Sequence, residues 1–274
     1  MHFYKYHGLG NDFVLTLDLD GTVEASPERA VRICDRHTGI GADGWMLIRR
    51  SAACDIQMFL YNSDGSVAEM CGNGLRCFAK FVYDHRLVEK EDFTVQTLAG
   101  VMQVHVTAED GVCQLVTANI GKPDFDRAAI PMVGQGECHR QTVTVLDREL
   151  TLSACLMGVP HAVVFGRDFT DSDVLKYGPP LEVSPLFPRK ANINFANILD
   201  ENTVEVRTWE RGCGRTLACG TGSCATAVLC HRAGFTKDRV EIRLQEGSLF
   251  IQVTRNGVIM TGPARLSFEG ETAL

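Results

Sequence analysis

The sequence carries one arrangement twice, and the two copies are 148 residues apart. Cys71 opens the stretch CGNGLRC and Cys219 opens CGTGSC, and residues typical of a helix follow each of them. The same separation joins three further pairs of landmarks: Gly10 and Gly158, Gly44 and Asn192, and Asn62 and Glu210. A constant separation across several landmarks indicates two copies of one domain.

Each copy combines short strands with one strong helix. The runs FTVQTLAGVMQVHV and RVEIRLQEGSLFIQV alternate apolar and polar residues, which predicts strands joined at glycine turns. Helical periodicity is strongest in LRCFAKFVYDHRLV and in SCATAVLCHRAG, where Gly234 predicts the helix end. Weaker helical patterns cover SPERAVRICDRH and SDVLKYGPPL. We therefore expect a mixed α/β fold of two pseudo-symmetric, sheet-rich, barrel-like domains, each with a central helix.

The Gly-Lys-Pro sequence at residues 121–123 lies where the first copy ends. Glycine and proline interrupt regular structure, so they favour a boundary at this place. We expect an N-terminal half over residues 1–118 and a C-terminal half over residues 119–263.

Composition indicates which kinds of binding partner and which cellular compartment to expect. The 274 residues carry a formal net charge of -7, which argues against a nucleic-acid or anionic-membrane partner. The N-terminus lacks a signal pattern, and no apolar run reaches membrane-spanning length. The 11 cysteines lack the regular spacing of a disulfide framework, so we expect a reducing cytosol.

A cysteine before Gly-x-Gly at a helix start has a recognisable chemistry. Glycines let successive N–H groups converge, and the first helical turn attracts a carboxylate or phosphate. The same field predicts a lowered pKa for the thiol. Two such thiols, one from each half, suggest a pair facing one bound anion from opposite sides. One thiolate would remove the α-proton of an amino acid while the other thiol delivers a proton to the opposite face.

Other uses of these cysteines fit less well. Cys71, Cys77, Cys219 and Cys224 could ligate zinc, but their spacings are looser than those of a usual knuckle. A thioredoxin-like centre needs C-x-x-C, and a phosphate loop needs a following Gly-Lys-Ser/Thr; both are absent at these stretches. Cys77 and Cys224 lie further along the helices, where packing is the simpler interpretation.

The motifs together resemble one family, the diaminopimelate epimerases. They are HGLGNDFV, RHTGIGADG, YNSDGS, MCGNGLRC, MGVPHAVV, WERGCGRTLACGTGSC and EGSLFI, and they span almost the whole chain. Members interconvert LL- and meso-diaminopimelate in lysine and peptidoglycan-precursor biosynthesis. The resemblance implies an active site between the halves, residues 264–274 returning to the first domain, and no pyridoxal or other cofactor. It also implies a homodimer with Phe268 at the contact.

The resemblance also assigns the site residues. Cys71 and Cys219 match the two acid/base thiols, and His161 and Glu210 match positions that tune the thiol pKa values. The substrate contacts it implies are the backbone of Gly72, Asn73, Gly220 and Thr221 and the side chains of Asn11, Asn62, Asn192, Glu210 and Arg211. Arg211 suits bidentate pairing with a distal carboxylate. Asn62, before Ser-Asp-Gly, is equally typical of a turn.

Three positions depart from the family pattern. Val159 stands where most members carry an asparagine that helps to bind substrate. Gly44 replaces a glutamine found in some members. Arg215 replaces a frequent glutamate, which would either lower the pKa of Cys219 further or point to solvent. Val159 leaves open a racemase for another amino acid, such as histidine. A non-enzymatic zinc or redox protein using the paired cysteines is a third possibility.

Overall fold

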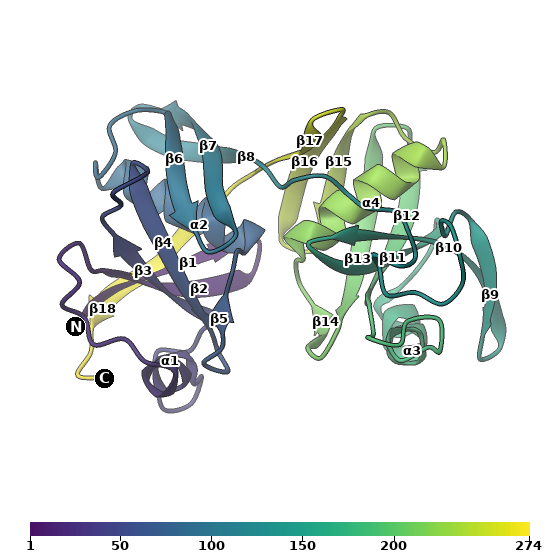
Figure 1. Ribbon diagram of the computed structural model, residues 1–274, viewed down its shortest axis with the longest axis horizontal. Helices are drawn as coiled ribbons and strands as arrows, with labels where there is room; N and C mark the ends of the chain where they lie inside the picture. Colours follow the sequence, from purple (N-terminus) through teal and green to yellow (C-terminus); the bar gives the residue numbers. More distant parts are fainter. The chain divides into compact units, whose positions relative to one another are not determined.

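The computed structural model describes residues 1–274, and the chain divides into two compact units. Unit 1 comprises residues 1–119 and 261–274, and unit 2 comprises residues 120–260. In Figure 1, unit 1 runs from purple to blue and includes the yellow C-terminal strand, whereas unit 2 runs from teal to yellow-green. No helix is both long enough and apolar enough to cross a membrane.

Unit 1 is built on a mixed sheet. Its strands are β1 (His2–Gly8), β2 (Asn11–Leu17), β3 (Gly44–Arg49), β4 (Ile56–Asn62), β5 (Val67–Ala68), β6 (Asp92–Thr97), β7 (Gly100–Glu109), β8 (Val112–Asn119) and β18 (Arg265–Glu271); its helices are α1 (Pro27–Cys34) and α2 (Gly72–Asp84). β18 pairs with β1 and β1 with β2, both antiparallel. Parallel pairs β2–β3 and β4–β6 alternate with antiparallel pairs β3–β4, β6–β7 and β7–β8.

Unit 2 repeats this order. Its strands are β9 (Gln141–Val145), β10 (Arg148–Met157), β11 (Val159–Gly166), β12 (Asn192–Asp200), β13 (Thr203–Glu210), β14 (Gly214–Thr216), β15 (Arg239–Leu244), β16 (Gly247–Thr254) and β17 (Gly257–Gly262); its helices are α3 (Asp171–Glu182) and α4 (Gly220–Arg232). β9–β10 and β10–β11 are antiparallel, β11–β12 is parallel, β12–β13 antiparallel, β13–β15 parallel and β15–β16 antiparallel.

Strand register confirms the internal repeat and the expected fold class. Phe13 pairs with Gly44 in the parallel pair β2–β3, and His161 pairs with Asn192 in β11–β12. Both members of the second pair lie 148 residues after their counterparts in the first. Because side chains alternate between the two faces of a strand, a one-residue slip would have exchanged those faces. The duplication therefore extends to which side chains face the core.

The two strong helices form as predicted, and both have 13 residues. α2 packs against β1, β2, β7 and β8, and α4 packs against β10 to β13, β15 and β16. Each helix is buried along most of its length, as a central helix must be. Gly234 adopts a φ of 77°, a left-handed conformation that favours glycine and follows the end of α4.

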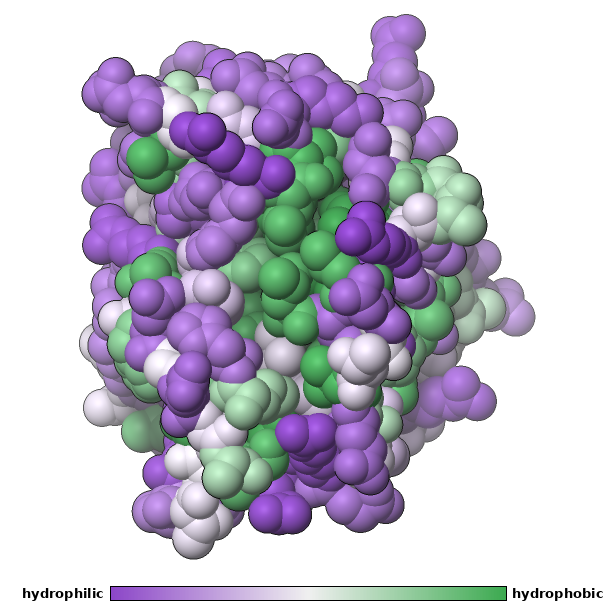
Figure 2. Space-filling view, turned by 90° about the vertical axis from the view of Figure 1, so that its left-hand side faces the viewer, coloured by the Kyte–Doolittle hydropathy of each residue, from purple (hydrophilic) through white to green (hydrophobic).

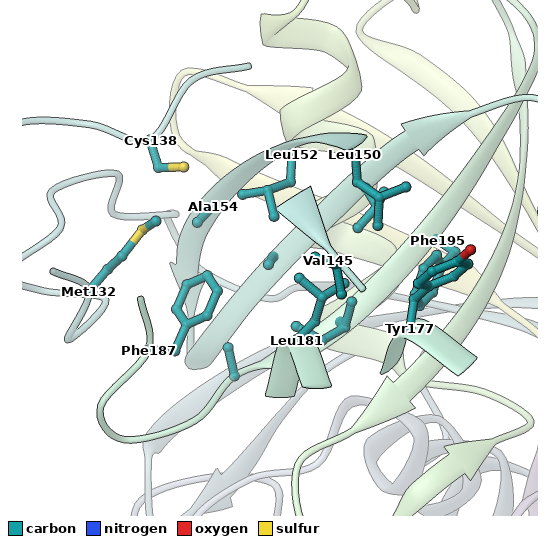
Figure 3. Packing of buried hydrophobic residues seen from close by; sticks show 14 of the residues in the cluster. Met132, Cys138, Val145, Leu150, Leu152, Ala154, Tyr177, Leu181, Phe187 and Phe195 are labelled. Carbon is teal, nitrogen blue, oxygen red and sulfur yellow. The ribbon is translucent and has the colours of Figure 1, made fainter. Parts of the chain in front are cut away.

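One core of unit 2 lies between α3 and the strands of its sheet (Figure 3). Tyr177 and Leu181 of α3 pack with Leu152 of β10 and Phe195 of β12. Thr170 begins α3 with a capping box, in which its side chain and that of Asp173 each accept a backbone hydrogen bond. The weaker helical pattern predicted for this segment is confirmed, as is the one that forms α1.

Candidate active site

Both Cys-Gly-x-Gly stretches form the same local structure. Cys71 is the N-cap of α2 with φ −139° and ψ 121°, and Cys219 is the N-cap of α4 with φ −123° and ψ 110°. The Sγ atom of Cys71 accepts a hydrogen bond from the Gly74 amide at 3.5 Å. That of Cys219 accepts one from the Gly222 amide at 3.3 Å. Each thiol thus takes the place that a serine or aspartate side chain usually fills at a helix start.

The residues after each cysteine supply the first N–H groups of a helix. Gly72 and Gly220 are the first helical residues, and both are buried. Asn73 and Thr221 follow them, and an intrahelical acceptor does not exist for amides in the first turn. These groups and the partial positive charge of the helix start suit a carboxylate.

In unit 1, Asn11 links the start of β2 to the cysteine turn. Its Oδ1 accepts a hydrogen bond from Asn73 Nδ2 at 3.0 Å and lies 3.9 Å from Cys71 Sγ. Its Nδ2 donates to Asp43 Oδ2 at 2.6 Å. Asp43 in turn forms an ion pair with Arg36 at 2.9 Å. Asn11 is therefore held from both ends in a fixed orientation.

Asp12 anchors the same region. Its carboxylate pairs with Lys5 Nζ at 2.8 Å and with Arg36 Nη2 at 2.7 Å. Burial by itself would raise the pKa of Asp12, but hydrogen bonds from Arg36 and Lys5 outweigh burial and hold the pKa well below its usual range. Lys5 also donates to the Gly41 carbonyl, so this cluster fixes the loop before β3.

The sequence left two interpretations for Asn62, and its contacts here are those of a turn. Its Nδ2 donates to Ser66 Oγ at 2.9 Å, and its backbone N–H bonds the Ser66 carbonyl. Ser66 also donates to Asp64 Oδ1 at 2.6 Å.

In unit 2, a chain of side chains reaches Cys219. His161 Nε2 lies 3.0 Å from Thr221 Oγ1, which lies 3.5 Å from Cys219 Sγ. His161 is fully buried. Burial, with a smaller effect from the Arg211 charge, lowers the pKa of His161 to about 3, so its imidazole is neutral.

The prediction of a lowered thiol pKa is wrong for Cys219. Burial raises its pKa well above the ordinary value, and the negative charge of Glu210 raises it further. Hydrogen bonds from Thr221 and Gly222 act in the opposite direction and are outweighed. The helix start is only one contribution, and the desolvation of a nearly buried sulfur exceeds it. Cys219 therefore rests as a thiol.

The turn after β13 carries Glu210 and Arg211. Glu210 Oε1 accepts a hydrogen bond from Thr216 Oγ1 at 2.5 Å. The Arg211 backbone N–H donates to Asn192 Oδ1 at 2.8 Å, and its exposed guanidinium donates to the Arg189 carbonyl at 3.1 Å. Asn192 thus holds the backbone from which Arg211 extends.

Two of the three departures from the family pattern have a structural explanation. A Cβ at Gly44 would come within 2.8 Å of the Tyr61 carbonyl oxygen, so a side chain at this place would require β3 and β4 to move apart. Arg215 forms an ion pair with Asp171 at 2.8 Å. Its charge is thereby engaged away from the thiol, and the expectation that it lowers the pKa of Cys219 further is not supported. Val159 begins β11 and is partly buried.

Several residues that hold the site were not predicted. Asn194, Asp43 and Glu182 are the main ones. Glu182 accepts hydrogen bonds from Trp209 Nε1 at 2.8 Å and from the Gly212 amide at 3.2 Å, bracketing the turn that carries Glu210. The signal for Asn194 was its place between the apolar residues Ile193 and Phe195, two residues after Asn192 and so on the same face of the strand.

No group of three or more His, Cys, Asp or Glu side chains is arranged to hold a metal ion. Cys77 and Cys224 are fully buried within their helices, as packing residues are. Burial raises the pKa of the Cys77 thiol to about 12.

Comparison with known proteins gives a consistent result over the whole chain. The family model described as diaminopimelate epimerase matches residues 3–125 and 153–267. A protein named diaminopimelate epimerase from Heliobacterium modesticaldum is 43% identical over 281 residues. The match covers 100% of this chain and 100% of that protein. One from Pelotomaculum thermopropionicum is 42% identical over 275 residues, covering 99% of this chain and 98% of that protein.

Solved structures share the fold at lower identity. A Bacillus anthracis phenazine biosynthesis protein of the PhzF family superposes with a TM-score of 0.75 at 19% identity, covering 100% of this chain and 99% of the other. A probable proline racemase from Agrobacterium radiobacter, solved with bound carbonate, gives a TM-score of 0.68 at 17% identity and covers 100% and 93%. Such a level of identity supports the two-domain fold alone.

Proposed function

The chain belongs to the diaminopimelate epimerase family, and we propose that it interconverts LL- and meso-diaminopimelate by moving a proton between the two faces of one α-carbon. In the cell this step would serve lysine and peptidoglycan-precursor biosynthesis. The observation that carries the mechanism is the matched construction of Cys71 and Cys219, each the N-cap of a 13-residue helix. A reaction that inverts a stereocentre in this way needs one proton-transfer group on each face of the carbon, and a thiol from each half would supply them.

In the proposed reaction one sulfur acts as the base and the other as the acid, and these roles are exchanged when the reaction runs in reverse. Cys219 rests protonated because its thiol pKa is raised, so it delivers a proton in the direction in which the Cys71 thiolate removes one. The C–H bond breaks toward Cys71 Sγ, a new C–H bond forms from Cys219, and Cys219 is left as a thiolate. In the reverse direction that thiolate is the base. Glu210 and His161 act on Cys219, the first by its charge and the second through Thr221.

Substrate binding is proposed for the groups around each thiol. The first-turn amides of Gly72, Asn73, Gly220 and Thr221 would hold the reacting carboxylate and stabilise the charge that grows on it. Asn11, Asn62, Asn192 and Glu210 would contact the remaining polar groups. Arg211 has an exposed guanidinium, and its planar fork suits the distal carboxylate of diaminopimelate. No cofactor takes part in this proposal, because the helix starts take over part of the electron sink's role.

A homodimer is proposed through unit 1. β18 is exposed over six of its seven residues, and it includes Leu266 and Phe268 with exposed fractions of 45% and 50%. Figure 2 shows a strip of hydrophobic surface bordered by hydrophilic residues on one face of the molecule. Exposed apolar surface with a polar border is typical of a protein interface.

A reducing cytosolic location is proposed from the many cysteine thiols.

Solvent deuterium exchange tests the proposed activity. The purified protein is incubated in D2O with LL-diaminopimelate, meso-diaminopimelate or L-histidine, and α-deuterium and stereochemistry are measured. We expect exchange and interconversion with both diaminopimelate isomers only. Exchange with histidine and none with diaminopimelate would replace the proposal with a histidine racemase, the alternative that Val159 leaves open.

A further inference from the structure

A buried amide lies beside the Cys219 turn. Asn194 of β12 is fully buried, and its Nδ2 lies 3.2 Å from the Ala162 carbonyl oxygen and 3.2 Å from His161 Nδ1. Its Oδ1 accepts a hydrogen bond from Thr208 Oγ1 at 3.2 Å. A carbonyl oxygen can only accept, so the NH2 group of Asn194 must face Ala162. The second hydrogen of that NH2 group then points to His161 Nδ1.

This contact decides the tautomer of the imidazole. Nδ1 of His161 accepts from Asn194, so a neutral ring carries its hydrogen on Nε2. Nε2 then donates to Thr221 Oγ1 at 3.0 Å. The hydroxyl oxygen is thereby occupied as an acceptor, and its own hydrogen is directed to Cys219 Sγ at 3.5 Å. A doubly protonated ring would place N–H against N–H at Asn194.

The first copy of the domain lacks this chain. Met46 and Phe13 lie 148 residues before Asn194 and His161. A Cβ at Gly74 would meet Met46 Cε at 2.5 Å and Phe13 Cζ at 3.5 Å, whereas a Cβ at Gly222 would meet Asn194 Oδ1 at 2.3 Å. The same backbone therefore folds over apolar side chains in unit 1. The fold therefore does not require hydrogen-bonded polar side chains beside the start of the helix.

We propose that Asn194 is a positioning residue for the Cys219 step: it holds His161 in the Nε2–H tautomer so that the Thr221 hydroxyl donates to the sulfur. The inference rests on the proposed two-thiol function. When Cys219 has given its proton to the α-carbon, its thiolate keeps two donors, the Gly222 amide and the Thr221 hydroxyl. His161 retains its proton throughout, and no group is oxidised or reduced. Two charged groups act on the chain, Glu210 on Cys219 and Arg211 on His161.

The test pairs two neutral substitutions in one strand. Asn194→Leu removes the amide that contacts His161 and adds no charge. Asn197→Leu removes another buried amide of β12, one that binds Phe169 and Glu205 instead. The tautomer of His161 is measured by ¹⁵N NMR of histidine-labelled protein, with the signal assigned by its loss in His161→Phe. The kcat and KM for diaminopimelate and the thermal midpoint are measured for each protein.

In the unsubstituted protein we expect a protonated Nε2 and an unprotonated Nδ1. Asn194→Leu should lose that preference and lower kcat about tenfold, the equivalent of one hydrogen bond, with KM within about twofold. Asn197→Leu should lose stability but keep the tautomer and kcat. A protonated Nδ1 in the unsubstituted protein would overturn the inference even if Asn194→Leu does not fold. So would a tautomer that Asn194→Leu leaves unchanged, or one that changes without any change in kcat.

The tautomer is measured without substrate, so failure of the proposed activity is seen separately. An unsubstituted protein with a fixed tautomer that epimerises no diaminopimelate would refute the proposed function. It would leave the arrangement of His161 established.

Discussion

Phe13 and His161 hold the same position in the two copies of the domain, Phe13 opposite Gly44 and His161 opposite Asn192. The backbones around them agree in register, but only His161 can donate and accept hydrogen bonds. The duplicated scaffold therefore presents two thiols by the same backbone device and surrounds them with different chemistry. We expect the two half-reactions to respond differently to equivalent substitutions.

Replacing either thiol should stop two-way turnover and leave the fold intact. In Cys71→Ser and Cys219→Ser the hydroxyl can still cap the helix, as serine commonly does. A serine hydroxyl is a far weaker acid than a thiol, so proton transfer through it fails. Epimerisation is measured from both isomers, with Cys54→Ser, outside both helix starts, as the control. Undiminished epimerisation by either variant would remove the two-thiol mechanism.

His161 should make stability depend on pH. Burial lowers the pKa of His161 from an ordinary 6.5 to about 3 in the fold. Between these values the unfolded chain binds a proton that the folded chain does not, so stability present above pH 6.5 is lost as pH falls, by roughly 1.4 kcal/mol per pH unit. Urea unfolding between about pH 7 and pH 5 measures this effect. In His161→Phe, which copies Phe13, the slope should be smaller; equal slopes would mean that His161 is not held neutral.

Equivalent glycines at the two helix starts should tolerate alanine unequally. A Cβ at Gly222 meets the Asn194 amide, which is fixed by its contacts with Ala162 and Thr208. The only atom that a Cβ at Gly74 would approach more closely than 3.4 Å is Met46 Cε, at the end of a flexible side chain. We expect Gly222→Ala to lower the thermal midpoint more than Gly74→Ala does. The opposite order would show that the fixed amide does not govern packing there.

The proposed dimer should depend on the apolar side chains of β18. Phe268→Asp places a charge where half of an aromatic ring is exposed and where the ring meets Phe3 edge-on at 6.0 Å. Light scattering over a concentration series should show monomer for the variant and dimer for the unsubstituted chain. Val112→Asp, at an exposed position of β8, is the control for added charge. A monomeric unsubstituted chain would reject the proposed assembly.

The sequence was sufficient for the repeat, the two central helices and the positions of the two cysteines. All three follow from local pattern: a constant separation, a helical period and a cysteine before glycines. The pKa of Cys219 could not be predicted in this way, since it depends on how completely strands distant in the sequence remove water from the sulfur.

The contacts that individual side chains make could likewise not be predicted from the sequence. Arg215 looked close to Cys219 along the chain, yet it pairs with Asp171 from α3, 44 residues away. Asn194 gave only the weak signal of a polar residue between two apolar neighbours. Its importance comes from its contacts with Ala162, His161 and Thr208, which no local spacing indicates.

The pairing of β18 with β1 affects the order in which the two units can complete their sheets during synthesis. β18 follows all the other described strands in the sequence, yet it pairs with β1, whereas unit 2 is one continuous segment. Unit 2 can therefore complete its sheet before β18 is synthesised, whereas in unit 1 the edge of β1 that faces away from β2 stays unpaired until β18 emerges. A chain whose synthesis stops before β18 would present that uncovered strand edge to its surroundings.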